Sequence, residues 1–175
     1  MSGPTVAPLV VLVGPPGAGK STVGAALAAR LGVSLRDTDA DIVVAAGQPI
    51  ADLFVDHGEA HFRELEAEAV RVALAEHDGV LALGGGAVLR EQTRQLLSGH
   101  AVVFLDVTLR DAVKRVGLDS PRPLLIGNPR ARWRELMEQR RPLYTEVARA
   151  VVATEGLTPD QVAEAVLNAL QLEKA

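Results

Sequence analysis

The segment at residues 14–21, Gly-Pro-Pro-Gly-Ala-Gly-Lys-Ser, constrains this chain more than any other feature. It fits a pattern of Gly, four residues and then Gly-Lys-Ser/Thr, in which glycines turn backbone N–H groups inward around phosphate oxygens. Lys20 supplies a positive charge to the β- and γ-phosphates, and the Ser21 hydroxyl is a magnesium ligand. The pattern follows an apolar run at 9–13 and precedes a helical segment whose N-terminus faces the phosphates. The sequence therefore predicts a nucleotide-binding protein.

Short β-branched runs alternate with longer segments of helical period, which is typical of a parallel sheet built from β-α-β units. The predicted strands are 9–13, 34–37, 79–83, 101–106 and 150–153. The predicted helices are 20–31, 40–46, 50–56, 59–76, 91–97, 110–116, 130–147 and 160–170. A length of 175 residues suits one domain. We expect a single domain over 1–175 with a three-layer α/β/α fold and helices on both faces of a five-stranded sheet.

One stretch breaks the alternation. Residues 117–129 carry three prolines and two glycines, which exclude a helix or a central strand. Loops of this length in compact domains commonly act as lids or binding loops. We therefore expect a mobile lid at about 117–129, within a basic stretch that runs from Arg110 to Arg149.

The composition excludes several classes of protein. The chain has no cysteine, so it cannot be a disulfide scaffold or use a thiol nucleophile, and this absence fits a cytoplasmic enzyme. A formal charge of −4 argues against a nucleic-acid partner, and the apolar runs are far shorter than the roughly 20 residues that span a membrane. No lysine follows an asparagine, so the base-reading Asn-Lys-x-Asp motif of a GTP switch is absent. These exclusions favour a small-molecule kinase.

Two further motifs lie at the predicted ends of strands. Asp37 and Asp39 close the second strand, where positions i and i+2 share a face, and ligands bind at the carboxyl ends of parallel strands. The pair could serve magnesium and an acceptor hydroxyl, or one member could cap the next helix. Three glycines at 84–86 end the third strand and either let a substrate approach the backbone closely or form a plain turn.

Together these residues resemble the shikimate kinase family. The family's motifs occur in order and with its spacing across about 8–170, at 14–21, 37–39, 58–63, 84–86, 122–125 and 140–144. The resemblance implies a nucleoside-monophosphate-kinase-like fold with strand order 2-3-1-4-5 and a shikimate-binding region at about 38–65. It implies transfer of the ATP γ-phosphoryl group to the 3-hydroxyl of shikimate. It also places residues 84–86 beside the phosphate loop. Asp106 ends the fourth strand as a Walker B aspartate would, but the implied strand order excludes it from the site.

The resemblance also implies roles for individual residues. The implied catalytic residues are Lys20, Asp39 and Arg122. Asp39 holds the shikimate hydroxyls and orients or deprotonates the attacking one, while Lys20 and Arg122 supply positive charge to the transferring phosphoryl group. The implied shikimate-binding residues are Asp39, Arg63, Gly85 and Arg140. Arg63 and Arg140 suit the carboxylate because a guanidinium can bind both oxygens at once.

The implied ATP-binding residues are Gly17, Ala18, Gly19, Lys20, Ser21, Thr22, Arg115, Arg122 and Pro159. Arg115 and Pro159 lie on the two faces of the adenine in this scheme. Mg²⁺, bound with ATP, is held by Ser21 directly and by Asp37 through water. The chain departs from the family at Leu157, where members often carry arginine or a polar residue. We therefore expect a hydrophobic or backbone-only contact there and a relaxed choice of nucleotide.

Two other functions remain open at this point. A gluconate-type kinase of a polyhydroxy acid would also use a phosphate loop, a lid and carboxylate-binding arginines. A non-catalytic nucleotide-sensing module would bind ATP without hydrolysis that an acceptor stimulates. For the kinase of shikimate, the expected partners are shikimate and ATP, with no nucleic acid and no membrane, and the chain is expected to act as a monomer.

Overall fold

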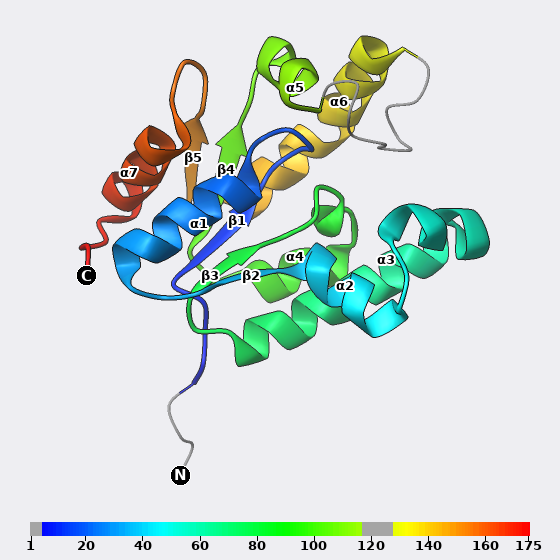
Figure 1. Cartoon of the computed structure of the whole chain (residues 1–175), viewed down its shortest axis with the longest axis horizontal. Coiled ribbons are helices and arrows are strands. Elements are labelled where there is room, and N and C mark those ends of the chain that lie inside the picture. Colours follow the sequence, from blue (N-terminus) through cyan, green and yellow to red (C-terminus); the bar gives the residue numbers. More distant parts are fainter. Residues whose placement is uncertain (1–4, 117–127) are drawn as a thin grey trace.

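A five-stranded parallel sheet forms the centre of the protein, with helices on both faces (Figure 1). The computed structural model describes residues 5–116 and 128–175. The strands are β1 (Val10–Val13), β2 (Leu35–Asp37), β3 (Val80–Ala82), β4 (Val102–Asp106) and β5 (Ala150–Ala153). Their order is β2-β3-β1-β4-β5, and every neighbouring pair is parallel. The predicted fold class and strand order are confirmed.

The helices cover the sheet in two layers. They are α1 (Lys20–Leu31), α2 (Thr38–Ala46), α3 (Ile50–Glu76), the 3₁₀ turn η1 (Ala87–Leu89), α4 (Glu91–Leu97), α5 (Leu109–Val116), α6 (Pro129–Val147) and α7 (Pro159–Leu170). Helix α1 packs against α7 on one face, and α3, α4, α6 and η1 pack together on the other (Figure 1). Helices α1 and α4 begin and end where the sequence predicts.

Helix α3 replaces the two predicted helices at 50–56 and 59–76. Its backbone leaves the helical conformation at one residue, Gly58, with φ 82° and ψ 169°. Glycine adopts a positive φ without the steric cost that a Cβ would impose. Gly58 therefore produces the break that the sequence predicts between the two segments.

The central strands carry the main core. Every residue of β1 and β3 is buried, as expected where helices cover both faces of a parallel sheet. A second, smaller cluster packs α2 against α3 through Ile42, Leu53 and Phe62. This second cluster holds together the region at about 38–65 that the sequence analysis assigns to the acceptor.

Most of the predicted lid, residues 117–127, lies outside the described residues. The last two positions of the predicted loop belong to the start of α6, where the Asn128 side chain caps the helix by accepting a hydrogen bond from the Ala131 N–H at 3.2 Å. Within 5–116 and 128–175, no helix has both the length and the apolar character needed to cross a membrane.

Candidate active site

The phosphate loop connects β1 to α1 as predicted. Gly17 and Gly19 adopt φ values of 87° and 83°, a conformation that favours glycine. Gly19 directly precedes the first residue of α1 and offers no side chain to cap it, and the N-terminus of a helix is a favourable place for an anion. The Lys20 ammonium bends back over the loop and donates hydrogen bonds to the Gly14 and Pro15 carbonyl oxygens at 2.7 and 3.0 Å. The positive groups of this loop therefore gather at the carboxyl end of β1.

The two predicted magnesium ligands meet at the edge of the phosphate loop. The Ser21 hydroxyl donates a hydrogen bond to Asp37 Oδ2 at 2.8 Å. A hydroxyl and a carboxylate are hard oxygen donors, and Mg²⁺ is usually bound through one or two carboxylates together with substrate phosphates and water. The residues present therefore fit a magnesium ion that arrives with a nucleotide.

The prediction that Asp37 and Asp39 share a strand face is wrong. Strand β2 ends at Asp37, and α2 begins at Thr38. Asp37 caps this helix, since its Oδ1 accepts a hydrogen bond from the Asp39 N–H at 2.8 Å. The capping alternative thus holds for Asp37, whose other oxygen still faces Ser21. Asp39 reaches the site from the first turn of a helix instead of from a strand.

The glycine triplet after β3 is a place of close approach. A Cβ on Gly84 would lie 2.7 Å from Asp39 Oδ1 and 2.9 Å from Glu66 Oε2. A Cβ on Gly86 would collide with the Arg63 guanidinium. A Cβ on Gly85 would lie 3.0 Å from the Pro16 ring of the phosphate loop. Side chains and the phosphate loop therefore lie against the glycine backbone, which leaves no room for a Cβ there. Approach of a substrate to this backbone stays a prediction.

Two arginines lie near this triplet, the buried Arg140 and the partly buried Arg63. Arg63 donates a hydrogen bond to Glu66 Oε1 at 2.9 Å and also pairs with Glu59 Oε1 at 3.3 Å. Arg140 is only 4% exposed, and its charge acts on both Glu66 and Tyr144. The structure therefore brings together Arg63, Arg140, Asp39 and the glycine triplet, which are the residues that the sequence analysis assigns to the acceptor.

Glu66 is a member of this cluster that the sequence analysis missed. It is 3% exposed, and burial raises the pKa of its carboxyl, although the neighbouring Arg63 acts in the opposite direction. The i,i+3 spacing of Arg63 and Glu66 was the available signal for their ion pair. The local sequence gave no indication that the Glu66 side chain would be buried.

Tyr144 is the second missed residue. The sequence analysis includes it only as the last residue of the motif at 140–144, and it lies in the main core with its ring 5.0 Å from that of Phe104. Its hydroxyl also donates a 2.5 Å hydrogen bond to the Gly85 carbonyl oxygen. Burial raises the pKa of Tyr144 to about 12, so the hydroxyl keeps its proton at neutral pH.

The prediction that residues 84–86, and not Asp106, lie beside the phosphate loop is wrong for Asp106. Strand β4 also borders β1, and a Cβ on Gly14 would lie 2.8 Å from the Leu105 carbonyl oxygen. The end of β4 is therefore as close to the phosphate loop as the glycine triplet is. The Asp106 carboxylate forms an ion pair with Arg141 Nη1 at 2.7 Å.

The predicted adenine and lid residues are only partly placed. Arg122 lies outside the described residues, and Arg115 belongs to α5. Pro159 is the first residue of α7, after a capping box formed by Thr158 and Gln161. Leu157 is partly buried against the main core. The contacts expected between these residues and the nucleotide stay predictions.

Comparison with known proteins gives consistent matches. A family model described as shikimate kinase matches residues 16–171. A shikimate kinase of Streptomyces avermitilis is 66% identical over 96% of this chain and 98% of its own length. The solved structure of an Acinetobacter baumannii shikimate kinase in complex with shikimate aligns with a TM-score of 0.90 and 35% identity, over 95% of this chain and 94% of that one.

A gluconokinase from Sinorhizobium meliloti aligns with a TM-score of 0.59 at 20% identity, over 96% of this chain and 94% of that one. Identity this low shows a shared fold alone. The family model and the S. avermitilis relative, by contrast, cover nearly the whole chain at a level that specifies a family. The chain belongs to the shikimate kinase family.

Proposed function

We propose that this protein transfers the γ-phosphoryl group of magnesium-bound ATP to the 3-hydroxyl of shikimate, giving shikimate 3-phosphate and ADP. The observation that carries the proposal is the contact of the glycine triplet with both halves of the site. Gly85 packs against Pro16 of the phosphate loop, and its neighbours Gly84 and Gly86 pack against Asp39 and the Arg63 guanidinium. A nucleotide bound on one side and an acceptor on the other would meet at this turn.

The acceptor side of the site suits a compact polyhydroxy carboxylate. Arg63 and Arg140 are planar cations that can each bind both oxygens of a carboxylate, and the low exposure of both side chains limits screening by solvent. We assign Asp39, whose Oδ1 lies against Gly84, to accept a hydrogen bond from a ring hydroxyl and to hold that hydroxyl toward the phosphate loop. The Gly85 carbonyl already accepts from Tyr144, so its backbone N–H is the group that we assign to the acceptor.

The donor side supplies positive charge and backbone donors. We assign the phosphates to the N–H groups of Gly17, Ala18, Gly19, Ser21 and Thr22 and to the Lys20 ammonium. Lys20 now donates to loop carbonyls, and the phosphates would replace these as its partners. Phosphoryl transfer depends mainly on positioning and on charge stabilisation, so these groups, with Arg122 from the lid, account for the catalysis that the proposal requires. Arg115 and Pro159 are assigned to the adenine.

Ser21 and Asp37 are the residues that would hold magnesium, Ser21 directly and Asp37 through water. When bound, the ion neutralises charge on the β- and γ-phosphates. The cap that Asp37 provides to α2 fixes its carboxylate next to Ser21. The same cap fixes the backbone of Asp39, so one side chain positions both the metal side and the acceptor side.

Release of ADP measured with a panel of acceptors tests the proposal. We expect turnover that depends on shikimate, with little or no stimulation by gluconate at the same concentration. Identification of the product by ³¹P NMR should show one new phosphate ester. Stimulation by gluconate alone would support the polyhydroxy-acid alternative, and tight ATP binding without stimulation by any acceptor would support a nucleotide sensor.

We further propose that the chain is a single-domain monomer that works in the cytoplasm with shikimate and ATP as its partners. The lack of cysteine supports a reducing compartment. All residues that we assign to the acceptor and donor sides belong to one chain, so the proposed reaction needs no second copy to complete the site. Sedimentation analysis at assay concentration tests this, with a single species near 18.4 kDa as the expected result.

A further inference from the structure

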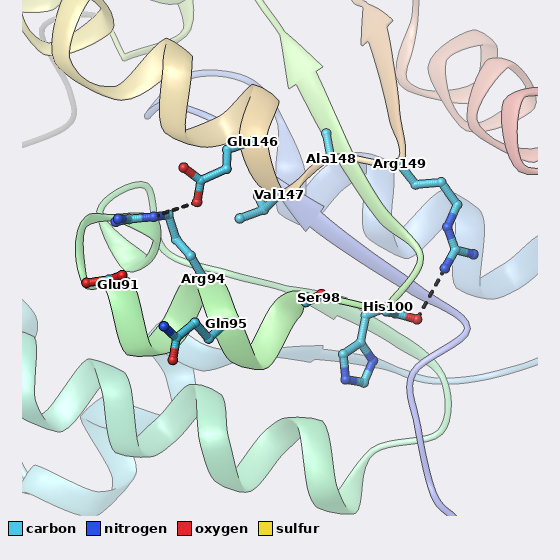
Figure 2. A pocket seen from close by; sticks show the side chains of 10 residues that line it. Glu91, Arg94, Gln95, Ser98, His100, Glu146, Val147, Ala148 and Arg149 are labelled. Atoms are coloured by element: carbon cyan, nitrogen blue, oxygen red, sulfur yellow. Dashed lines mark hydrogen bonds and ion pairs between the residues drawn. The ribbon is translucent and has the colours of Figure 1, made fainter.

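Arg94 joins three elements from a place outside the acceptor cluster. From α4, its Nε donates to Glu146 Oε2 on α6 at 2.8 Å (Figure 2). Its Nη1 donates to the carbonyl oxygens of Val88 and Leu89 in η1 at 2.9 and 3.1 Å. The Arg94 side chain is 17% exposed and that of Glu146 is 56% exposed, so the bonds to the η1 carbonyls are shielded from solvent while the ion pair lies at the surface.

The two elements that Arg94 ties to α4 adjoin two parts of the acceptor cluster, the glycine triplet and Arg140. The 3₁₀ turn η1 directly follows the glycine triplet, and the Ala87 and Leu89 N–H groups donate to the Gly84 and Gly86 carbonyl oxygens, both at 3.1 Å. Helix α6 carries Arg140, which lies about 9 Å along the helix axis from Glu146 at 1.5 Å per residue.

A second hydrogen bond joins α6 to the glycine triplet that precedes η1. The Tyr144 hydroxyl on α6 donates to the Gly85 carbonyl oxygen. Helix α6 also packs in the main core through Trp133, Leu136 and Met137, and the two ties add polar contacts that position its last turns against the glycine turn. Arg94 therefore completes a two-point attachment of α6 to the glycine turn.

We propose that Arg94 is a positioning residue for acceptor binding, which holds the Arg140 end of α6 in register with the glycine turn. This inference rests on the proposed function, because the acceptor is shikimate. Arg94 touches neither substrate and acts through Glu146 and the η1 carbonyls. A small displacement of binding groups costs affinity steeply, so loosening of α6 should weaken acceptor binding more than ATP binding.

The surroundings of Arg94 allow this idea to be tested by substitution. A pocket of about 500 Å³ opens beside Arg94 and Glu146 and is also lined by His100 and Arg149 (Figure 2). Shortening the Arg94 side chain would enlarge an open polar pocket and would not leave a sealed apolar cavity. An Arg94→Gln protein should therefore fold.

The experiment is steady-state kinetics of wild type, R94Q, R94K and E146Q, each with both substrates varied. The control is R71Q, which removes the exposed Arg71–Glu68 pair on α3. We expect R94Q to raise the KM for shikimate on the order of tenfold and to leave the KM for ATP unchanged. In R71Q, both KM values should match those of wild type. R94K should recover part of the loss, and E146Q should show a smaller rise because the η1 contacts remain.

Hydrogen exchange of the free protein gives a readout that does not depend on turnover. Amides of η1 and of the last turns of α6 should exchange faster in R94Q than in wild type and R71Q. A wild-type KM for shikimate in R94Q, an equal rise in both KM values, or unchanged exchange would overturn the inference while leaving shikimate turnover by wild type intact. A wild-type protein without that turnover would instead reject the proposed function, and the assignment of Arg94 to the acceptor with it.

Discussion

The Tyr144 hydroxyl donates a 2.5 Å hydrogen bond to the carbonyl oxygen of Gly85 and so connects helix α6 to the glycine turn. The bond lies in the core, and its two ends sit next to Arg140 on one side and the phosphate loop on the other. It fixes where Arg140, which we assign to the acceptor, lies relative to the loop that would hold ATP.

Removal of this hydroxyl should destabilise the protein and weaken acceptor binding. Tyr144→Phe keeps the ring and its contact with Phe104 but leaves the Gly85 carbonyl without this donor, which costs about 1–3 kcal/mol. We expect a lower free energy of unfolding in urea and a higher KM for shikimate. Because the pKa of Tyr144 is raised to about 12, the difference between the two proteins should not vary with pH in the neutral range. Equal stability and equal KM would contradict the role given to this bond.

The buried Glu66 should make stability depend on pH in a defined direction. Burial raises the pKa of Glu66 above its ordinary value of 4.5, so the folded protein binds more protons than the unfolded chain between these two values. Stability from this group therefore falls as pH rises through that window. The free energy of unfolding of Glu66→Gln, minus that of wild type, should rise with pH from about 4.5 upward.

Glu68→Gln provides the matched control, because Glu68 lies two residues along α3 and is exposed. Its hydrogen bond with Arg71 lowers the pKa of Glu68, so its contribution is present above 4.5 and is lost as pH falls. The corresponding difference for Glu68→Gln should therefore change with the opposite sign and at lower pH. Identical pH profiles for the two variants would contradict a raised pKa of Glu66 in the folded protein.

Loss of the Ser21 hydroxyl should raise the magnesium requirement. Ser21→Ala removes one of the two oxygen groups that meet at 2.8 Å, and we expect the Mg²⁺ concentration for half-maximal rate to increase about tenfold or more. Ser98→Ala, at an exposed position beyond α4, is the control. A magnesium titration at fixed ATP and shikimate measures the effect, and a curve for Ser21→Ala that superimposes on wild type would exclude Ser21 as a ligand.

Substitution of Asp39 should slow catalysis with little effect on ATP. Asp39→Asn keeps the shape of the side chain but removes the charge that would orient or deprotonate the acceptor, so kcat should fall by about 10²–10⁴-fold. Asp41→Asn is the comparison, because Asp41 lies two residues along α2 and pairs with Arg36 at 2.7 Å. ATP affinity, measured by titration without acceptor, should match wild type in both. A wild-type kcat in Asp39→Asn would mean that the assignment of Asp39 is wrong.

Much of the fold follows from local patterns in the sequence. The phosphate loop was recognisable because its glycines, Lys20 and Ser21 stand between an apolar strand and a helix. The break at Gly58 was also readable, since glycine interrupts a helical period there. Resemblance to the family, and not periodicity, supplied the strand order and the joint assignment of Asp39, Arg63, Gly85 and Arg140.

The parts that could not be predicted depend on contacts between distant residues. Periodicity indicates which face of a helix is buried but not which group it meets, so the hydrogen bond of Tyr144 to Gly85 and the burial of Glu66 were missed. The Asp37–Asp39 error has a local cause. Asp37 both ends a strand and caps a helix. Because the helix begins at the next residue, Asp39 lies on a helix and not on the strand.

Asp106 illustrates a limit of strand order as an argument. Two strands border β1, so adjacency to the phosphate loop cannot separate the glycine triplet from the end of β4. Their charged neighbours differ, because Asp106 is paired with Arg141 while the glycine triplet lies against Asp39 and Arg63.

The most direct test of the account is a crystal structure of the protein with shikimate bound. The account predicts electron density for one cyclic carboxylate at the glycine turn, with its carboxylate between Arg63 and Arg140 and a ring hydroxyl on Asp39. Shikimate bound at another place, or at this turn with its carboxylate away from both arginines, would contradict it.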